Sequence, residues 1–297
     1  MSNDKFIEYL TTEPLFGPYS AWLAKLCKIK RGMHVLDVGC GIGVSTFPLL
    51  DMIGPKGKIE GVDISLQSIS QALKRAEYLQ VPNASFSVCN AEKLDFSDSI
   101  FDCVLSSFAI NQVNDKLQAL SEMIRVLKPG GYLGFTIPGL DHFKEFFDIA
   151  ASILKEESFY HQKNKLQTGP DTYQALLRSL GIVDLQIYSK VATVNISTIE
   201  DYDVILKTRG PQNAVLSRLA ENRRAIVWQE ILDEFKEKLG KDQYLHLTIS
   251  AHGFVLRKPF LHLTPFLSPY PSIILSFSYK TRLHNILYCF TQMAPMI

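Results

Sequence analysis

Short apolar runs alternate with helical patterns between residues 33 and 137. The runs are rich in Val, Ile, Leu and Phe and are bounded by Gly, Pro, Asn or Asp: HVLDVG, KIEGVD, SFSVCN, FDCVLSSF and GYLGFTIP. Continuous apolar runs of this kind are typical of parallel strands that are covered on both faces. The repeated order of strand, helix and strand predicts an α/β fold with a doubly wound sheet, on which ligands bind beyond the carboxyl ends of the strands.

Two helices are predicted between these strands. The first follows Ser65, a predicted N-cap, and has apolar residues at helical spacing: Leu66, Ile69, Leu73 and Ala76. The second shows the same spacing at Leu117, Leu120, Ile124 and Leu127. The KPGG residues that follow are expected to stop this second helix.

The segments around this core are predicted to be helical as well. Residues 1–30 are interpreted as one or two N-terminal lid helices broken at TEPLFGP. The core is assigned to residues 31–195, and it ends with a helix at TYQALLRSLGI and a strand near residues 183–194. Together these assignments place the predicted core between a lid and a second helical segment.

That second segment, residues 196–243, is predicted to be a helical insertion that covers the substrate site. It begins with STIE, Ser197 to Glu200, which is a capping-box pattern. Residues 244–258 alternate between apolar and polar side chains and are predicted to form an antiparallel last strand of the core.

The tail, residues 259–297, contains no acid, and its only charged residues are Lys280 and Arg282. Prolines interrupt its apolar stretch and disfavour a membrane-spanning helix. The sequence is compatible with an amphipathic helix that contacts a membrane, a partner or the protein itself, and equally with a tail that lacks fixed structure.

Composition and charge narrow the classes of partner. Of 297 residues, 46% are hydrophobic and 21% are charged, which is typical of a globular protein. A net charge of +1 does not favour an extended nucleic-acid surface. The five cysteines form no CxxC and the N-terminus shows no secretory signal, so we expect a cytoplasmic protein. The histidines lack metal-ligand spacing, so no metal is expected.

A glycine-rich stretch, VLDVGCGIG, follows the first strand and leads toward a helix that is expected to start near Val44. It contains three glycines: Gly39, Gly41 and Gly43. Missing side chains let a ligand approach the backbone N–H groups of such a loop. Asp63 ends the next strand, where an acid can accept hydrogen bonds from a ribose, although a turn or N-cap role is the alternative. The dinucleotide pattern GxGxxG is absent because Val44 and Thr46 stand at the positions where it would need glycine.

Five stretches in this order resemble class I S-adenosylmethionine-dependent methyltransferases: VLDVGCGIG, GVDIS, NAEKLDF, FDCVLSSFAI and IRVLKPGGYL. The resemblance covers about residues 30 to 140 and is greatest to the ubiquinone/menaquinone C-methyltransferases and their small-molecule relatives. It implies a Rossmann-like sheet of seven strands, mostly parallel with an antiparallel last strand. It also implies S-adenosyl-L-methionine as the cofactor.

The resemblance also implies which residues bind the cofactor. Asp37 would face the amino group of the cofactor through water, Asp63 would bind the ribose, and Ile64 would pack on the adenine. Asn90 and Ala91 would read the edge of the adenine. The full set implied by the resemblance is Asp37, Gly39, Gly41, Ile42, Gly43, Asp63, Ile64, Asn90, Ala91 and Ser107.

Two departures from the quinone enzymes concern the acceptor. Those enzymes often carry Thr where Ile42 stands and carry Arg where Asn111 stands, and they lack the insertion and the tail. A quinone acceptor is therefore not predicted, and we expect a small molecule that offers a carbon, oxygen or nitrogen nucleophile. The alternatives are methylation of a protein or an RNA, and a cofactor-binding module without catalysis.

A catalytic base is needed when the nucleophile is a carbon or a hydroxyl group. Asp141 and His142 come just after the fifth strand and are the predicted catalytic residues. Tyr19 and His161 are weaker candidates for the same role.

Overall fold

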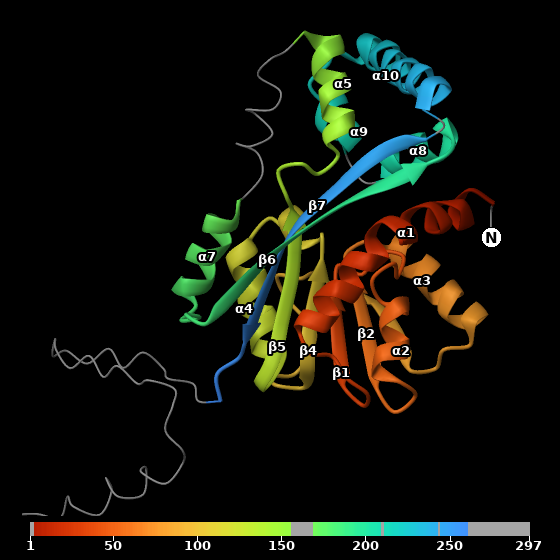
Figure 1. Ribbon diagram of the computed structural model, residues 1–297. Helices are drawn as coiled ribbons and strands as arrows, with labels where there is room; N and C mark the ends of the chain where they lie inside the picture. The colour runs from red at the N-terminus through yellow and green to blue at the C-terminus, as the bar shows by residue number, and fades with distance from the viewer. Residues whose placement is uncertain (1–2, 156–168, 209–210, 243, 261–297) are drawn as a thin grey trace, which may run out of the picture. The chain divides into compact units, whose positions relative to one another are not determined.

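The computed structural model describes residues 3–155, 169–208, 211–242 and 244–260, which contain a seven-stranded sheet (Figure 1). The strands are β1 (His34–Val38), β2 (Lys58–Asp63), β3 (Ala84–Val88), β4 (Phe101–Ser107), β5 (Leu127–Pro138), β6 (Leu185–Ile196) and β7 (Leu245–Arg257). Their order across the sheet is β3-β2-β1-β4-β5-β7-β6. β7 is antiparallel to both of its neighbours, and the other neighbouring pairs are parallel. The predicted doubly wound sheet with an antiparallel last strand is confirmed.

Helices cover both faces of this sheet. The described helices are α1 (Asn3–Leu26), η1 (Phe47–Leu49), α2 (Leu50–Ile53), α3 (Leu66–Leu79), η2 (Ile110–Gln112), α4 (Lys116–Val126), α5 (Lys144–Leu154), α7 (Pro170–Ser179), α8 (Ile199–Thr208), α9 (Pro211–Leu216) and α10 (Glu221–Asp242). Of these, α5 and α8 to α10 lie at one end of the sheet rather than on its faces (Figure 1). Val35 and Cys103 are buried against α1 and α2, whereas the adjacent Leu36 and Val104 are buried against α4 and α7. Successive strand residues point to opposite faces, so burial on both faces explains the continuous apolar runs.

Residues 3–26 form one helix, so the predicted break at TEPLFGP is wrong. The helix continues through Pro14 and Pro18, although proline lacks the N–H that bonds to the preceding turn. Packing explains this, because residues spaced four apart on one face are buried, namely Leu15, Tyr19 and Leu23. The Tyr19 hydroxyl also donates a 2.5 Å hydrogen bond to the carbonyl oxygen of Ile249 in β7. Contacts with the sheet therefore outweigh the local preference for a break.

The second predicted helix ends earlier than expected. α4 stops at Val126, and Leu127 is the first residue of β5, which runs through the KPGG residues. Groups from elsewhere bond the last carbonyls of α4: the N–H of Ile100 lies 2.9 Å from the oxygen of Val126. The buried ammonium of Lys258 lies 2.7 Å from the oxygen of Ile124 and 2.6 Å from that of Leu127. These donors replace the helical N–H groups and end the helix.

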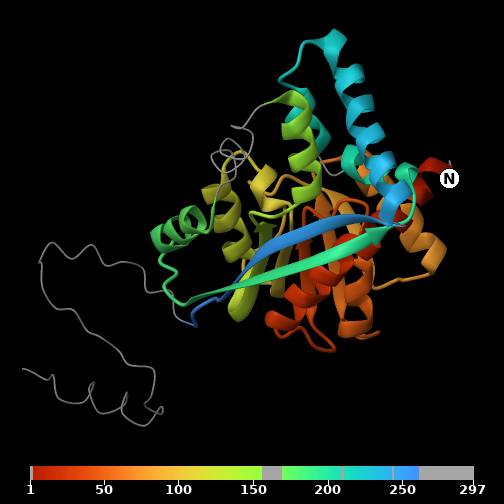
Figure 2. The same ribbon diagram turned by 45° about the horizontal axis from the view of Figure 1, so that its top comes forward.

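β6 and β7 extend beyond β5 as a two-stranded ribbon (Figure 2). β5 pairs with β7 from Arg257 to Ala251, whereas the pairing of β6 with β7 continues until Ile196 lies opposite Leu245. The chain between these two ends forms α8, α9 and α10. They share an apolar cluster with α5 and the extended part of β7. We call α5, α8, α9 and α10 the cap helices.

The helix after β6 begins one residue later than the STIE pattern predicts. The Thr198 hydroxyl, rather than that of Ser197, accepts a 3.1 Å hydrogen bond from the N–H of Asp201. It also donates to the Asp201 carboxylate at 2.7 Å. The helix could begin after Ser197 or after Thr198. β6 ends at the buried Ile196, and the later start leaves two residues, Ser197 and Thr198, for the turn.

The described helices include no segment that is both long and apolar enough to cross a membrane. The tail, for which the sequence left several structures open, falls almost entirely in residues 261–297, outside the described residues, and so does His161.

We expect Lys258→Met to lower the free energy of unfolding by about 2–4 kcal/mol, measured by urea denaturation. The substitution keeps the apolar stem but leaves the carbonyls of Ile124 and Leu127 without a charged donor, and each such hydrogen bond contributes about 1.5–3 kcal/mol. Lys56→Met changes an exposed lysine and should shift stability by less than about 0.5 kcal/mol. Equal stability of the two variants would contradict the role given to Lys258.

Candidate functional site

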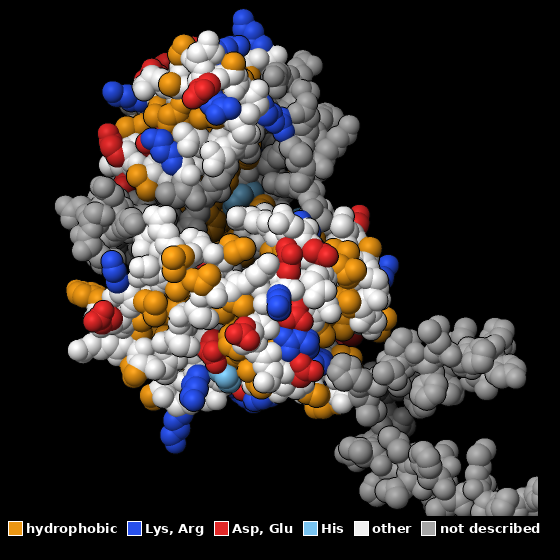
Figure 3. Space-filling model, turned by 180° about the vertical axis from the view of Figure 1, so that it is seen from behind, with side chains coloured by type: hydrophobic (Ala, Val, Ile, Leu, Met, Phe, Trp, Pro, Cys, Tyr) orange, Lys and Arg blue, Asp and Glu red, His pale blue; other side chains and the backbone are white. Residues whose placement is uncertain are grey.

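A cavity of about 800 Å³ lies at the carboxyl ends of β1, β2 and β4 and extends to the cap helices. Its walls come from α1, the loop after β1, the ends of β2 and β3, the segments after β4 and β5, and α8 and α9. Figure 3 shows the molecule hollowed between the cap helices and the sheet, with hydrophobic side chains in the hollow. The cavity therefore lies at the edge of the sheet where doubly wound folds bind ligands.

The three predicted glycines all have positive φ angles: Gly39 (+75°), Gly41 (+56°) and Gly43 (+88°). A Cβ atom on Gly39 would lie 2.2 Å from Ala109, and one on Gly43 would lie 2.2 Å from Phe47. Those two glycines therefore permit close packing within the protein. A Cβ atom on Gly41 would meet no atom within 4 Å, and Gly41 lines the cavity. The missing side chain of Gly41 thus leaves room for a ligand.

The sequence predicted a helix that starts near Val44, and this prediction is wrong. Turns occupy residues 41–46, followed by η1 and the four-residue α2. The hydroxyls of Ser45 and Thr46 donate to the carboxylate of Asp37. These two bonds tie residues 45 and 46 to the buried acid of β1 and so hold the turns in place.

Asp37 is fully buried below this loop. Its Oδ2 atom accepts 2.6 Å hydrogen bonds from Ser45 and Thr46, while no described residue bonds its Oδ1 atom. Burial raises the pKa of Asp37 to about 6; the two hydroxyls oppose this shift, and the nearby Asp63 adds to it. Asp37 does not line the cavity, but Ser45 does. The charge of Asp37 therefore acts on the cavity through the Ser45 hydroxyl.

Asp63 holds the glycine loop in place. One carboxylate oxygen accepts the N–H of Gly41 at 2.9 Å, and the other accepts the N–H of Ser65 at 2.8 Å. The Ser65 hydroxyl in turn accepts the N–H of Ser68, so the predicted N-cap is confirmed. Each carboxylate oxygen keeps a second acceptor site, so the same acid can fix the turn and bind a hydroxyl group in the cavity.

Ile64, Asn90 and Ala91 line the cavity on the same side as Asp63. The side chain of Ile64 is 72% exposed, although an apolar side chain is stabilised by being covered. The Asn90 side chain accepts the N–H of Glu92 at 2.9 Å and so holds the turn after β3. This side therefore offers an apolar surface beside polar backbone groups, which suits a nucleobase.

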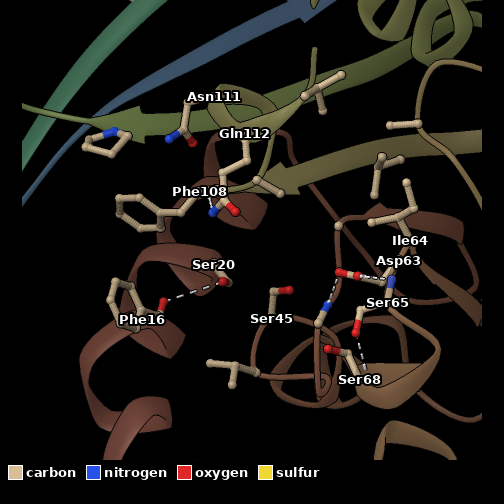
Figure 4. A pocket seen from close by; sticks show the side chains of 18 of the residues that line it. Phe16, Ser20, Ser45, Asp63, Ile64, Ser65, Ser68, Phe108, Asn111 and Gln112 are labelled. Carbon is tan, nitrogen blue, oxygen red and sulfur yellow. Dashed lines mark hydrogen bonds between the residues drawn. The ribbon is translucent and has the colours of Figure 1, made fainter. Parts of the chain in front are cut away.

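The opposite side of the cavity is an aromatic wall formed by Phe16, Phe108, His142, Phe143 and Phe147. The centroid of the His142 ring lies 5.4 Å from that of Phe108 and 4.3 Å from that of Phe143. Phe108 (φ +56°) and Phe143 (φ +57°) both have left-handed backbones. This conformation is rare for bulky residues and concentrates at functional sites. In Figure 4, Phe16 and Phe108 face Asp63 and Ile64 across the cavity.

The imidazole of His142 is buried and oriented by the backbone of β7. Its Nδ1 atom lies 3.0 Å from the carbonyl oxygen of Ser250 and 3.3 Å from the Ser250 nitrogen. The shorter contact favours a proton on Nδ1, which donates to the carbonyl oxygen. His142 lines the cavity, whereas its neighbour Asp141 is exposed and is not among the lining residues.

Five residues predicted for the site are absent from the described cavity lining: Asp37, Ile42, Gly43, Ser107 and Asp141. Ile42 is buried in the apolar cluster that joins α1 to the cap helices. The Ser107 hydroxyl lies 3.2 Å from that of Ser20, which does line the cavity. Ile42 and Ser107 therefore support the walls from behind.

Several lining residues were not predicted: Phe16, Ser20, Phe108, Phe143, Phe147, Lys207 and Asn213. Phe16 and Ser20 lie one helical turn apart on α1, and their spacing was a usable signal. The others come from separate segments, and only the tertiary fold brings them together.

Residues 29–204, more than half of the chain, match the family described as "Methyltransferase domain". The chain belongs to this family. It is an S-adenosylmethionine-dependent methyltransferase, as the resemblance implied. The methyltransferase is 29% identical over 182 residues to the ubiquinone/menaquinone biosynthesis C-methyltransferase UbiE of Enterobacter sp. (strain 638), covering 56% of this chain and 72% of the relative. The same values apply to UbiE of Escherichia coli (strain K12 / DH10B).

Solved structures show the same fold. The methyltransferase is similar to YcgJ from Bacillus subtilis, with a TM-score of 0.53, 17% identity, and coverage of 81% of this chain and 97% of that one. It is also similar to phosphoethanolamine N-methyltransferase 2 of Haemonchus contortus in complex with S-adenosyl-L-methionine. That comparison gives a TM-score of 0.52, 22% identity, and coverage of 82% of this chain and 52% of the other.

The cavity fits S-adenosylmethionine, and we propose that the methyltransferase holds it as the resemblance implied. The open space at Gly41 admits the cofactor beside the loop, and Asp63 is placed to accept hydrogen bonds from the ribose. The exposed Ile64 is placed to pack on the adenine. The Ser45 hydroxyl lines the cavity and is placed to accept from the ammonium group, with the buried carboxylate of Asp37 behind it. Across the described residues, no group of three or more His, Cys, Asp or Glu side chains could hold a metal ion.

Asp63→Ala should weaken binding of S-adenosylmethionine, measured by calorimetry. Each charge-assisted hydrogen bond lost from the carboxylate removes about 1.5–3 kcal/mol of binding free energy. Asp51→Ala removes an exposed acid of α2 and should leave the affinity unchanged. Wild-type affinity in Asp63→Ala would mean that the cofactor does not use this acid.

The affinity for S-adenosylhomocysteine should rise with pH between about 5 and 7. The pKa of Asp37 is raised above its ordinary value. In the free enzyme the ionised acid is therefore disfavoured, and its contribution to the stability of the fold falls as the pH rises from 3.8 to about 6. A bound ammonium group favours the ionised form, so deprotonation of Asp37 strengthens binding.

Methylthioadenosine, which lacks the amino-acid part, is the matched control for this titration. Its affinity should be nearly constant over the same pH range. A parallel rise for both ligands would assign the pH dependence to a group other than Asp37.

Proposed function

We propose that this methyltransferase transfers the methyl group of S-adenosylmethionine to a small molecule that is bound between the aromatic wall and the cap helices. The proposal rests mainly on the extent of the cavity, which continues from the glycine loop along the aromatic wall to Lys207 of α8 and Asn213 of α9. Cavities of about 300–1,000 Å³ are typical of sites that enclose small molecules.

The charges around the cavity support the same proposal. Among the described residues that line it, Lys207 is the only lysine or arginine, and its ammonium pairs with the Asp203 carboxylate at 2.5 Å. An RNA acceptor would need several basic side chains to neutralise its phosphates. The described lining offers no such cluster, so a small acceptor is favoured.

When bound, S-adenosylmethionine supplies a sulfonium methyl group, which a nucleophile displaces in line. The protein must align the acceptor and exclude water. We assign these tasks to α1, the aromatic wall and the cap helices. A carbon or hydroxyl nucleophile must also lose a proton, and we assign its removal to His142. The Ser250 carbonyl favours the Nδ1–H form, in which Nε2 is the proton acceptor.

The acceptor can be identified with methyl-labelled S-adenosylmethionine. A cell extract is divided by ultrafiltration into a metabolite fraction and a macromolecular fraction, and each is incubated with the enzyme. We expect the label in a small product of the metabolite fraction. Label that appears only in protein or RNA would contradict the proposal.

His142→Gln should lower kcat with that acceptor by about 10²–10⁴-fold if the nucleophile must lose a proton. The affinity for S-adenosylmethionine should not change. Asp141→Asn alters the exposed neighbour and should retain the wild-type kcat. A larger loss in Asp141→Asn than in His142→Gln would reverse the assignment of the base.

A further inference from the structure

Asn111 lies in η2, just after β4, and lines the cavity. Its amide oxygen is buried and has no hydrogen-bond partner in the described structure. The neighbouring Gln112 differs, because its amide donates to the carbonyl oxygen of Phe108 at 3.5 Å. Figure 4 shows Asn111 beside Phe108, across the cavity from Asp63 and Ile64. Asn111 therefore belongs to the acceptor side of the cavity.

A buried oxygen that accepts no hydrogen bond is destabilising, and we expect it to be paired with a donor in the functional complex. The Cβ–Cγ torsion of asparagine is broad, so the amide can turn and its oxygen can face a donor in the cavity that Asn111 lines. An amide carries no charge, so its oxygen accepts a hydrogen bond from a hydroxyl or N–H group without providing a counter-ion. Asn111 thus suits a neutral donor.

The wall next to Asn111 is apolar and rigid. The Phe108 ring packs at 5.3 Å from the ring of Phe16 and at 5.6 Å from that of Tyr19, both nearly edge-on. The left-handed backbone of Phe108 is held by its N–H, which donates to the Thr136 hydroxyl at 3.0 Å. A strained residue persists only where its surroundings fix it. Phe108 therefore presents a fixed apolar surface to the acceptor.

None of the five residues that form the aromatic wall is an acid, a lysine or an arginine. The acids of the described lining, Asp63 and Glu92, come from the ends of β2 and β3. Lys207, from α8, pairs with Asp203. A charged group of an acceptor at the aromatic wall would be buried without a counter-ion, which is strongly unfavourable.

We propose that Asn111 and Phe108 select an uncharged acceptor with an apolar body and a hydroxyl or N–H group. The apolar body packs on Phe108, and the hydroxyl or N–H group donates to the amide oxygen of Asn111. This inference rests on the proposed function, since it assumes that the acceptor binds at the aromatic wall.

Binding of small probes tests the inference without turnover. The enzyme is saturated with S-adenosylhomocysteine, and phenol, toluene, benzoate and tetramethylammonium are titrated separately by ligand-observed NMR. Phenol should bind about fivefold more tightly than toluene, as expected for one net hydrogen bond. Benzoate should bind more weakly than toluene, and tetramethylammonium, which the aromatic rings attract without a counter-ion, should bind more weakly than phenol. Tighter binding of either ion than of phenol would overturn the proposal, and so would no detectable binding of any probe.

Three variants assign the roles of the residues. Asn111→Leu should reduce phenol binding to the level of toluene and leave toluene unchanged. Phe108→Leu should weaken both probes. Asn222→Leu, which changes an exposed amide of α10, should bind all probes as the wild type does. S-adenosylhomocysteine affinity, measured in each variant, checks that the cofactor site is intact.

A phenol preference that persists in Asn111→Leu would overturn the role of Asn111. These outcomes do not depend on catalysis, so they are distinct from a failure to find a labelled small product. If the label appeared in a macromolecule while the probes behaved as expected, the proposed function would fail and the chemistry assigned to the wall would stand.

Discussion

The carboxylate of Asp63 fixes the geometry on which the cofactor side depends. It joins two segments that meet only at the edge of the sheet, because one oxygen bonds the N–H of Gly41 after β1 and the other bonds the N–H of Ser65 before α3. Two backbone donors on one acid hold the loop open where Gly41 has no side chain. Below the loop, Asp37 is held by Ser45 and Thr46, so the turn that follows the glycines is fixed from both sides.

The side of the cavity proposed to bind the acceptor is built differently. Aromatic packing, rather than backbone hydrogen bonding, sets its shape: Phe16 comes from α1, Phe108 follows β4, and His142 and Phe143 follow β5. The two left-handed phenylalanines show that this arrangement is imposed by tertiary contacts. The enzyme thus joins a cofactor side defined by local loops to an acceptor side defined by distant segments.

This difference explains what could be predicted from the sequence. The sheet, the Ser65 cap and the glycine loop depend on short-range patterns, and they were predicted. Apart from His142, the aromatic wall was missed because its members extend along the chain from Phe16 to Phe147 and share no motif. The continuous α1 was missed because burial of Leu15, Tyr19 and Leu23 overrides the prolines. The turns after the glycines were missed because Ser45 and Thr46 bond to Asp37, eight and nine residues earlier in the chain, and no local pattern shows these contacts.

The cap helices α8–α10 lie in the sequence between Ile196 and Leu245. These two residues are paired with each other at the end of the β6–β7 ribbon. Since the two attachment points are adjacent, the length and sequence of the inserted segment are not constrained by the register of the sheet. The segment can diverge, or be exchanged for that of another enzyme, while the strands below it remain unchanged. Under the proposed function, this one continuous segment supplies Lys207 and Asn213, so a change within it alters the acceptor end of the cavity without altering the strands.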